Sequence, residues 1–424
     1  MPNSTRLTAG LRLFCIYFAA VSVSLPMAWI SLGKLLLFAS ALVYFSAQLL
    51  TQKNDAALRR LWSVKVVLLI VAVFAFSLLW TEAPTDIALL AFAKHSKLLE
   101  IALLVSLIRN AREARFALLA FSLGQTSFIL SSWVMATGYR VPWATSEAHP
   151  DYTYVVYSTY LDQTLIFAGA AAVFWHLRQQ LLLLPWLALL MALLAVGNNL
   201  FLQVGKTGYL ATLAVFALAV AWEIPKKWRL TMLVLVPLVA GAGLYAGSAK
   251  FQGKVSQVVA ESQGYANAGD SATSSGLRLH AWKRSLQAMA QQPLTGHGVG
   301  SWTQSVKRIE GADAQKVFRN GLTSNPHQEF LLWGVELGVG GTLLLLALIA
   351  SLTRDALTFS TPVMRATLSM VALMVVACLF NCSLYDALIG DFFCVTLGLL
   401  LALGSREPNP GSPALPEATV KFAT

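Results

Sequence analysis

Apolar runs long enough to cross a lipid bilayer recur along this sequence, and they constrain its fold more than any other feature. Of the 424 residues, 57% are hydrophobic and only 12% are charged. A hydrocarbon core about 30 Å thick needs about 20 apolar residues in a helix, and inside it every backbone polar group must be bonded within the segment. We therefore predict an all-α integral membrane protein with about twelve transmembrane helices. The runs lie near residues 11–27, 30–50, 63–80, 88–108, 115–136, 154–175, 181–202, 207–222, 230–247, 329–352, 363–380 and 386–404.

The basic residues of the short connections predict how these helices are oriented. Lys and Arg gather in the cytoplasmic loops of membrane proteins. Alternate connections are rich in these residues, whereas the intervening ones are poor in cations, as in the acidic string at 81–86. We expect both termini to be cytoplasmic and the helices to span a phospholipid bilayer, which in a bacterium would be the inner (plasma) membrane. The net charge of +11 then reflects this bias and not nucleic-acid binding.

One long polar segment interrupts the apolar runs and divides the chain. We expect nine helices in residues 1–247, a mainly helical periplasmic loop domain at 248–326, three helices in 327–404 and a disordered cytoplasmic tail at 405–424. The segment 248–326 carries nine Lys or Arg against four acids, a net charge of +5. This excess predicts an anionic partner such as a phosphate-bearing lipid. A solvated basic face is the open alternative.

The cysteines and the acidic residues predict neither a disulfide framework nor a metal site. Cys15, Cys378 and Cys394 fall inside apolar runs, and Cys382 is expected to be exposed near the outer face. The sequence has no Cys and His cluster with the spacing of zinc ligands. We therefore expect no metal and no cofactor.

Charged residues inside the apolar runs are candidate functional groups, because charge in hydrocarbon is costly. Lys94 and Lys97 lie on one helix face, where they predict either an outward phosphate contact or side chains that snorkel to the interface. Asp162 predicts either an interhelical pair or a cavity. Lys206 and Thr207 follow a turn at a helix start, where free N–H groups and the helix dipole favour an anion.

The loop domain carries a cation in an unusual place. The string SSGLRLHAWKRSL begins an amphipathic helix, with Leu279, Trp282, Leu286 and Met289 expected along one stripe. Arg278 falls in the first turn, where a cation is unfavourable for the helix dipole. An anion held between Arg278 and the helix start would explain its position.

An alternating glycine turn follows this helix, with Gly296, Gly298 and Gly300. Glycine lets the backbone approach another group closely. The turn therefore predicts either a backbone cradle for a ligand or a plain loop.

His327 is the strongest single catalytic candidate. It follows an Asn-Pro pair, which favours an extended approach, and it directly precedes an apolar run. We expect it to project from the outer end of the tenth helix into a cavity covered by the loop domain. A histidine there can accept a proton near neutral pH, although a helix cap or an interface residue is the alternative.

The residues after His327 carry a family resemblance. The pattern is His, then Asn, Ser or Gln, nine arbitrary residues, Gly, two arbitrary residues, and Gly, Thr or Tyr; His327, Gln328, Gly338 and Gly341 meet it in full. In this pattern and in its topology, the chain resembles the O-antigen ligase and polymerase group of bacterial membrane glycosyltransferases, most closely the lipid A core:O-antigen ligases. The resemblance implies a fold similar to GT-C type glycosyltransferases.

Two further positions agree with the resemblance less specifically. The family has a Gly-Leu-Arg string in the periplasmic loop, met here by residues 276–278. An outer turn commonly carries Arg, then Ser or Thr, then Gly, whereas this chain has Lys206, Thr207 and Gly208. Lysine keeps the charge but loses the planar two-pronged grip on phosphate, so this position is a departure.

The resemblance implies metal-independent, inverting transfer of O-antigen polysaccharide from undecaprenyl pyrophosphate to a sugar hydroxyl of lipid A core, at the periplasmic face, in lipopolysaccharide biosynthesis. We expect His327 to act as general base and Arg278 to stabilise the pyrophosphate, because the leaving group accumulates negative charge that fixed cations must meet. The remaining candidate substrate-binding residues are Lys206, Thr207, Gln328, Lys94, Lys97 and Arg284.

Three other functions stay open at this point. An O-antigen polymerase uses the same donor with a lipid-linked acceptor. A protein O-oligosaccharyltransferase is also compatible, although that group usually has a longer C-terminal periplasmic portion. A lipid-linked polysaccharide transporter predicts internal repeats and polar residues spread over several central helices, which the sequence lacks.

Overall fold

The computed structural model describes residues 2–51, 60–149, 152–157, 159–203, 205–319, 321–322 and 324–407, and every element within these ranges is helical. The predicted tail at 405–424 lies largely outside them. Before the loop domain the helices are α1 (Pro2–Ser22), α2 (Met27–Thr51), α4 (Trp62–Ser77), α5 (Thr85–Ser96), α6 (Leu99–Leu107), α7 (Ala111–Ala136), α8 (Tyr160–Leu177), α9 (Pro185–Gly197), η2 (Asn198–Leu202), α10 (Lys206–Glu223), η3 (Lys226–Trp228) and α11 (Arg229–Gly247). The remainder are α12 (Ala249–Ala268), α13 (Ser274–Gln291), α14 (Trp302–Glu310), η4 (Gly311–Asp313), α15 (Ala314–Arg319), α16 (Glu329–Ala356), α17 (Thr361–Phe380) and α18 (Ala387–Arg406).

Helices occupy all the predicted apolar runs, but fewer of them qualify as membrane spans than the sequence predicts. Among the described residues, seven helices are long and apolar enough to cross a membrane. Others are shorter, such as α4, or carry polar residues, such as α8 with Asp162 and α10 with Lys206. The predicted run at 88–108 is broken into α5 and α6 around Lys97. The chain is therefore an all-α membrane-type protein, and the count of twelve stays a prediction.

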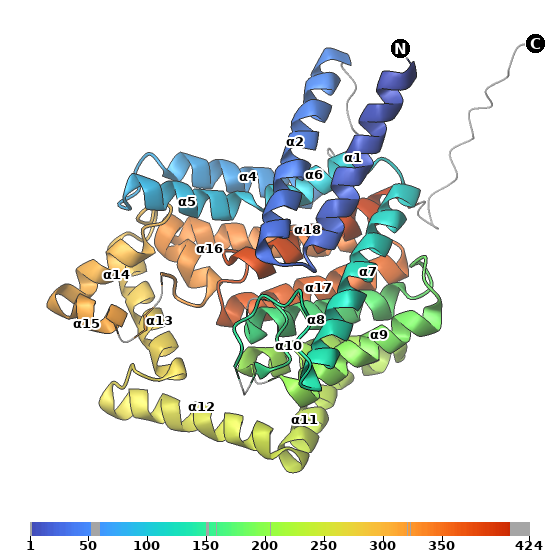
Figure 1. Cartoon of the computed structure of the whole chain (residues 1–424). Helices are drawn as coiled ribbons and strands as arrows, with labels where there is room; N and C mark the ends of the chain where they lie inside the picture. The colour runs from blue at the N-terminus through green and yellow to red at the C-terminus, as the bar shows by residue number, and fades with distance from the viewer. Residues whose placement is uncertain are drawn as a thin grey trace, which may run out of the picture.

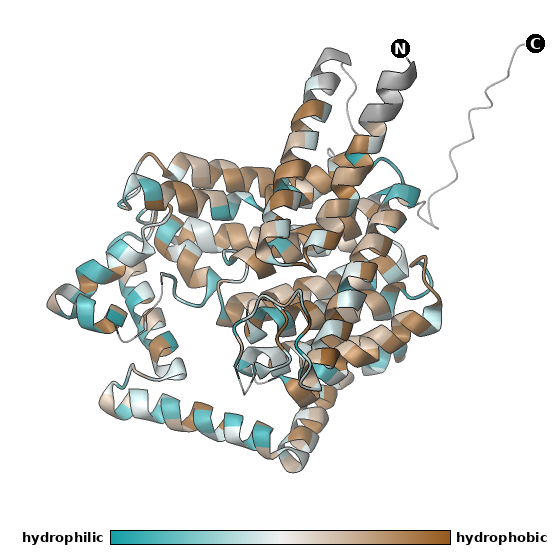
Figure 2. Ribbon diagram, viewed as in Figure 1, coloured by the Kyte–Doolittle hydropathy of each residue, from teal (hydrophilic) through white to brown (hydrophobic). Residues whose placement is uncertain are grey.

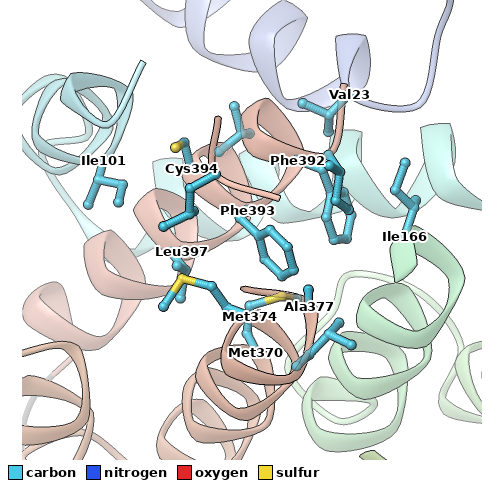
Figure 3. Close-up of a cluster of buried hydrophobic side chains, with 14 of the residues drawn as sticks. Val23, Ile101, Ile166, Met370, Met374, Ala377, Phe392, Phe393, Cys394 and Leu397 are labelled. Carbon is cyan, nitrogen blue, oxygen red and sulfur yellow. The ribbon is translucent and has the colours of Figure 1, made fainter. Parts of the chain in front are cut away.

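The centre of the bundle is α18, which is buried over almost its whole length. It packs against α6, α17 and α7. Figure 3 shows Phe393 and Leu397 of this helix facing Met370 and Met374 of α17, with Phe392 beside Ile166 of α8. A helix that is apolar on all sides is typical of the middle of a membrane bundle, so α18 is the axis around which the other helices are arranged.

Polar contacts join the ends of helices that the sequence places on the cytoplasmic side. The Asp355 carboxylate at the end of α16 accepts hydrogen bonds from the backbone N–H groups of Trp62 (3.1 Å) and Ser63 (2.7 Å) at the start of α4. Arg12 of α1 pairs with Glu113 of α7 at 2.8 Å. The packing therefore brings together helix ends that the sequence predicts to lie on one side of the membrane. Which compartment that side faces stays a prediction.

The segment 248–326 forms helices α12 to α15, which lie to one side of the bundle (Figure 1). Helix α13 packs against α16. Its predicted apolar stripe is wrong, because the buried face holds Ala281, Ser285 and Ala288, whereas Leu286 is exposed. By contrast, α12 is a largely hydrophilic rod (Figure 2), and none of its described residues is buried.

The alternating glycine turn binds protein backbone and leaves no cradle for a ligand. The N–H of His297 donates to the carbonyl of Val335 (2.9 Å), and that of Gly298 donates to Glu336 (2.8 Å). A Cβ at Gly296 would lie 2.5 Å from the Glu336 backbone. The turn therefore docks the loop domain directly onto α16.

Gly338 of the sequence motif produces a kink in α16 at the same place. Its φ of 66° and ψ of −155° are non-helical, and the next N–H, from Val339, donates to the carbonyl of Pro293 at 2.8 Å. A Cβ at Gly338 would lie 2.5 Å from that carbonyl oxygen. The motif glycine is explained by docking of the loop domain and not by chemistry.

We predict that Gly338→Ala lowers the melting temperature of the detergent-purified protein. A φ of 66° with a ψ of −155° is a conformation that essentially only glycine adopts, and it costs an alanine roughly 1–3 kcal/mol; the contact with Pro293 adds to this. Gly340→Ala is the matched control, because Gly340 lies in the same helix with nothing within 4 Å of its Cβ position. Equal melting temperatures for the two variants would contradict this explanation of the kink.

Candidate functional site

His327 lies two residues before α16 in a conformation that glycine usually adopts. Its φ is 53°, the one positive value among the described non-glycine residues, and its N–H donates to the Asn325 side chain at 3.0 Å. The neighbouring Gln328 caps α16, since its side-chain oxygen accepts from the N–H of Leu331 (2.6 Å). A strained backbone held by such contacts is common at functional sites.

The half-buried His327 lines a cavity of about 310 Å³ together with Asp162, Asn381 and Asp386. The lining comes from α2, the start of α8 and the connection between α17 and α18. The loop domain contributes none of the described lining residues, so the expectation that it covers this cavity is wrong. Asp162 does mark a cavity, as one of the two predictions for it requires.

A buried carboxylate fixes the connection 381–386 against the start of α16. Glu329 is fully buried, and its Oε2 accepts from the backbone N–H groups of Leu384 (2.9 Å) and Tyr385 (3.4 Å). Its Oε1 accepts from the Trp333 indole at 2.9 Å. Because His327 and Glu329 are two residues apart, this carboxylate holds the connection beside the histidine. Cys382 in the same connection is buried and not exposed as expected.

Lys97 holds the other side of this connection. Its Nζ donates to the backbone carbonyls of Asp386 (2.6 Å) and Tyr385 (3.3 Å), and its side chain is buried. Lys97 therefore positions backbone in the structure instead of facing outward. Lys94 lies over the ring of Tyr385, with Nζ 4.2 Å from the centroid.

Arg278 reaches His327 from the loop domain. Its Nη2 donates to the Oδ1 of Asn381 at 3.3 Å, and Asn381 lines the His327 cavity. Burial, followed by the charge of Arg278, lowers the pKa of His327 to about 4. The histidine is therefore neutral at physiological pH and able to accept a proton.

Arg278 also lines a second cavity, of about 350 Å³, with Lys206 and Thr207 of α10. Phe380 lines this cavity and the next residue, Asn381, lines the first, so consecutive residues lie between the two cavities. The structure thus brings together Arg278, Lys206 and Thr207 on one side of this point, with His327 on the other.

Local packing places Lys206 at the first position of α10. Gly208 lies so close to α8 that a Cβ there would be 2.0 Å from the Thr164 side chain. The preceding turn is held by buried amides: Asn199 donates to the Thr164 carbonyl (2.9 Å), and Gln203 donates to Asn198 (3.1 Å). The close contact between α10 and α8 therefore requires glycine at position 208, because a larger residue would clash with Thr164.

The anion predicted at the start of α13 is a carboxylate of the chain itself. Glu261 of α12 accepts from the Ser275 N–H at 3.0 Å and pairs with Lys206 Nζ at 3.1 Å. Burial raises the pKa of Glu261, but hydrogen bonds from Ser275 and Lys206 outweigh this and lower it to about 2. Glu261 is therefore charged.

Arg284 lies away from both cavities. Its Nε and Nη2 donate to the two carboxylate oxygens of Glu310 at 2.5 and 3.1 Å, and His280 contacts the same carboxylate at 2.6 Å. This cluster ties α13 to α14, so the guanidinium of Arg284 has a partner within the loop domain.

Three residues of the site escaped the sequence analysis: Glu329, Asn381 and Asp386. Burial, followed by the charge of Asp162, raises the pKa of Asp386 to about 6. Asn381 and Asp386 occur in the short string NCSLYD between two apolar runs, and a polar group there is one signal that could have found them. Glu329 could have been found as an acid inside the His327 motif.

The arrangement suits group transfer from an anionic leaving group to a hydroxyl. Arg278 and Lys206 line one cavity, where developing negative charge can be stabilised. The neutral imidazole of His327 lines the other cavity, where a hydroxyl can lose its proton. Among the described residues, no group of three or more His, Cys, Asp or Glu could hold a metal ion.

Comparison with known families identifies the segment that carries most of this site. Residues 191–346 match the model of the O-antigen ligase family. The matched segment includes Lys206, Arg278 and His327, whereas Asn381 and Asp386 lie beyond it. No curated protein matches the chain.

We predict that Arg278→Gln raises the pKa of His327 from about 4 towards the ordinary value of 6.5, because a nearby positive charge disfavours the protonated imidazole. Hydrogen–deuterium exchange at the imidazole C2 position, followed by mass spectrometry, measures this pKa for each histidine. The exposed Lys283 of the same helix provides the control variant Lys283→Gln. An unchanged pKa in Arg278→Gln would refute the electrostatic contact.

Proposed function

We propose that this chain is a lipid A core:O-antigen ligase, a membrane glycosyltransferase; the match of residues 191–346 to the O-antigen ligase family model supports this proposal. In this proposal it transfers O-antigen polysaccharide from undecaprenyl pyrophosphate to a sugar hydroxyl of lipid A core. The observation that supports the proposal is that consecutive residues, Phe380 and Asn381, line two cavities, one with Arg278 and Lys206 and the other with His327.

The donor pyrophosphate is proposed to bind in the cavity of Arg278, Lys206 and Thr207. Arg278 provides a planar donor group that can bind two phosphate oxygens at once, and Lys206 adds a second positive charge. The Thr207 hydroxyl and the first N–H groups of α10 lie beside them and add donors. These groups together match the charge of a pyrophosphate leaving group.

An apolar groove along α10 is suited to the polyprenyl chain of this donor. Its volume is about 570 Å³, and its lining includes Leu213 and Phe216 of α10 and Leu244 of α11. Helix α10, which begins at Lys206, lines both this groove and the proposed pyrophosphate site. A chain of isoprene units gains by leaving water for such a surface.

The acceptor is proposed to enter the cavity lined by His327, Asp162 and Asp386. The two acids offer hydrogen-bond acceptors to sugar hydroxyls. Asp386 is also held in place by Lys97, which donates to its backbone carbonyl. The reacting hydroxyl is then presented to His327 at the junction with the donor cavity.

In the proposed reaction, the acceptor oxygen attacks the anomeric carbon as the bond from that carbon to the pyrophosphate oxygen breaks. The pyrophosphate leaves with the bonding electron pair, and His327 takes the proton from the hydroxyl. Direct displacement inverts the anomeric carbon. Donor binding would also neutralise the charge of Arg278, which raises the pKa of His327 and makes it a stronger base.

The topology completes the proposal. The positive-inside pattern supports cytoplasmic termini in a bacterial inner membrane, which puts His327 and the loop domain on the periplasmic face.

The acceptor distinguishes this ligase from an O-antigen polymerase or a protein O-oligosaccharyltransferase of the same broad family. Purified chain in liposomes, given undecaprenyl-linked glycan with lipid A core, a second lipid-linked glycan or a protein acceptor, separates the three by product. Transport of the lipid-linked donor without acceptor would favour a transporter.

We predict that His327→Ala lowers the rate of transfer to lipid A core on the order of 10²- to 10⁴-fold, the usual contribution of a general base. Binding of undecaprenyl pyrophosphate should stay within about twofold of wild type, because His327 faces the other cavity. Rates come from a gel-shift assay of the reconstituted protein. His149→Ala, at an exposed histidine elsewhere, is the control; wild-type transfer by His327→Ala would exclude His327 as base.

A second prediction concerns the charge of Arg278. Replacement by Gln should lower transfer on the order of 10²- to 10³-fold and weaken undecaprenyl pyrophosphate binding, whereas Arg278→Lys should retain part of both because it keeps the charge. Lys283→Gln makes the same charge change at an exposed position of α13 and should behave as wild type. If Lys283→Gln and Arg278→Gln lose activity equally, general surface charge and not a phosphate site accounts for the effect.

A further inference from the structure

The start of α13 is built to bind an anion, and a carboxylate of α12 fills it. Thr273 caps this helix, and the next free N–H, from Ser275, donates to Glu261 Oε2 at 3.0 Å. The same oxygen lies 3.1 Å from Lys206 Nζ, and the Glu261 side chain is 10% exposed. Its Oε1 accepts from Gln257 at 2.7 Å. Glu261 therefore makes the contacts that a phosphate oxygen would make at a helix N-terminus.

These contacts belong to the wall of the cavity proposed to hold the donor pyrophosphate. Lys206, Ser275 and Arg278 line that cavity, and so do Val258 and Ser262 of α12. The two α12 residues flank Glu261 within one helical turn. Helix α12 thus forms one side of the cavity. Its Glu261 pairs with Lys206, a cation that is proposed to bind the donor.

The charge of Glu261 opposes the donor directly. Hydrogen bonds from Ser275 and Lys206 keep its pKa near 2, so it is an anion at every physiological pH. A pyrophosphate that approaches Lys206 meets the negative charge of Glu261, which already pairs with the same ammonium group. Either the phosphate binds weakly, or the carboxylate leaves.

Helix α12 is able to move because little else holds it. None of its described residues is buried, and its packing partners are α11 and α13. Gly269 ends the helix with a left-handed φ of 66°, and Gly247 precedes it, each with nothing within 4 Å of its Cβ position. Figure 1 shows α12 as a rod that bridges α11 and α13 at the edge of the molecule.

Two further contacts of α12 with the bundle lie near its first turn. Lys250 donates to the carbonyl of Leu202 at 2.6 Å, and Phe251 contacts the ring of Tyr209 edge-on. A contact at this end can act as a pivot, whereas the pair of Glu261 with Lys206 restrains the middle of the helix.

We propose that Glu261 is a latch: its carboxylate stands in for the donor phosphate and holds α12 over the Lys206 and Arg278 cavity, and the pyrophosphate of the donor displaces it and swings α12 outward. This proposal rests on the proposed function, which places the pyrophosphate at these cations. It adds that the donor site is closed before the donor binds and opens by exchange of one anion for another.

Affinity for undecaprenyl pyrophosphate tests the latch. Glu261→Gln keeps the shape of the side chain and removes its charge, so the protein in nanodiscs should bind undecaprenyl pyrophosphate on the order of tenfold more tightly than wild type. Asp313→Asn, an equal charge change at an exposed residue of the loop domain, should bind as wild type. Wild-type or weaker affinity in Glu261→Gln overturns the latch, and so does an equal gain in Asp313→Asn.

A distance measurement tests the movement of α12 directly. The four native cysteines are buried, so spin labels at Ser256→Cys on α12 and Lys283→Cys on α13 report on α12. In otherwise wild-type protein, undecaprenyl pyrophosphate should shift the distance distribution, and Glu261→Gln should populate the shifted distance without ligand. An identical distribution with and without undecaprenyl pyrophosphate overturns the latch.

Arg278→Gln separates failure of the latch from failure of the proposed function. If Arg278→Gln loses undecaprenyl pyrophosphate binding while Glu261→Gln binds as wild type, the donor site is supported and the latch alone is overturned. If Arg278→Gln binds as wild type, the donor site is elsewhere and both proposals are overturned.

Discussion

The rest of the site depends on the hydrogen bonds that the buried carboxyl group of Glu329 accepts from the connection between α17 and α18. This group accepts two backbone N–H groups from the connection while it stands at the start of α16. This bond places Asn381 where Arg278 can reach it from the loop domain. A polar group fully removed from water persists only when its hydrogen bonds are satisfied, and here these bonds join the start of α16 to the connection between α17 and α18. Asn381 and Asp386, which line the His327 cavity, belong to this connection.

Much of the helical fold and part of the site follow from the sequence. Hydrophobic length predicts where helices occur, and the start of α10 at Lys206 and the helix that contains Arg278 were both predicted from local signals. The apolar stripe of α13 was predicted wrongly because small residues, not large ones, make close contact between helices; Ala281, Ser285 and Ala288 form its buried face. Asn381 and Asp386 were missed because their position depends on a contact with Glu329, more than 50 residues away, and no local pattern records such a contact.

Two of the motif residues turn out to have structural explanations. Gly338 permits the kink where the loop domain meets α16, and Gly208 permits the contact of α10 with α8. His327 and Arg278, by contrast, are placed at the junction of two cavities, where their charge and protonation affect each other. Glu261 is of interest because it already binds two groups that suit a phosphate, the start of α13 and Lys206. A site that binds a multiply charged lipid can be kept closed in this way by a single acid.

The most direct test of the account is a cryo-EM structure of the protein in a lipid nanodisc with undecaprenyl pyrophosphate bound. The account predicts phosphate density within hydrogen-bond distance of Arg278 and Lys206, on the opposite side of Asn381 from His327. Phosphate density beside the arginines at the other end of the bundle, with the cavity of Arg278 and Lys206 unchanged, would contradict it.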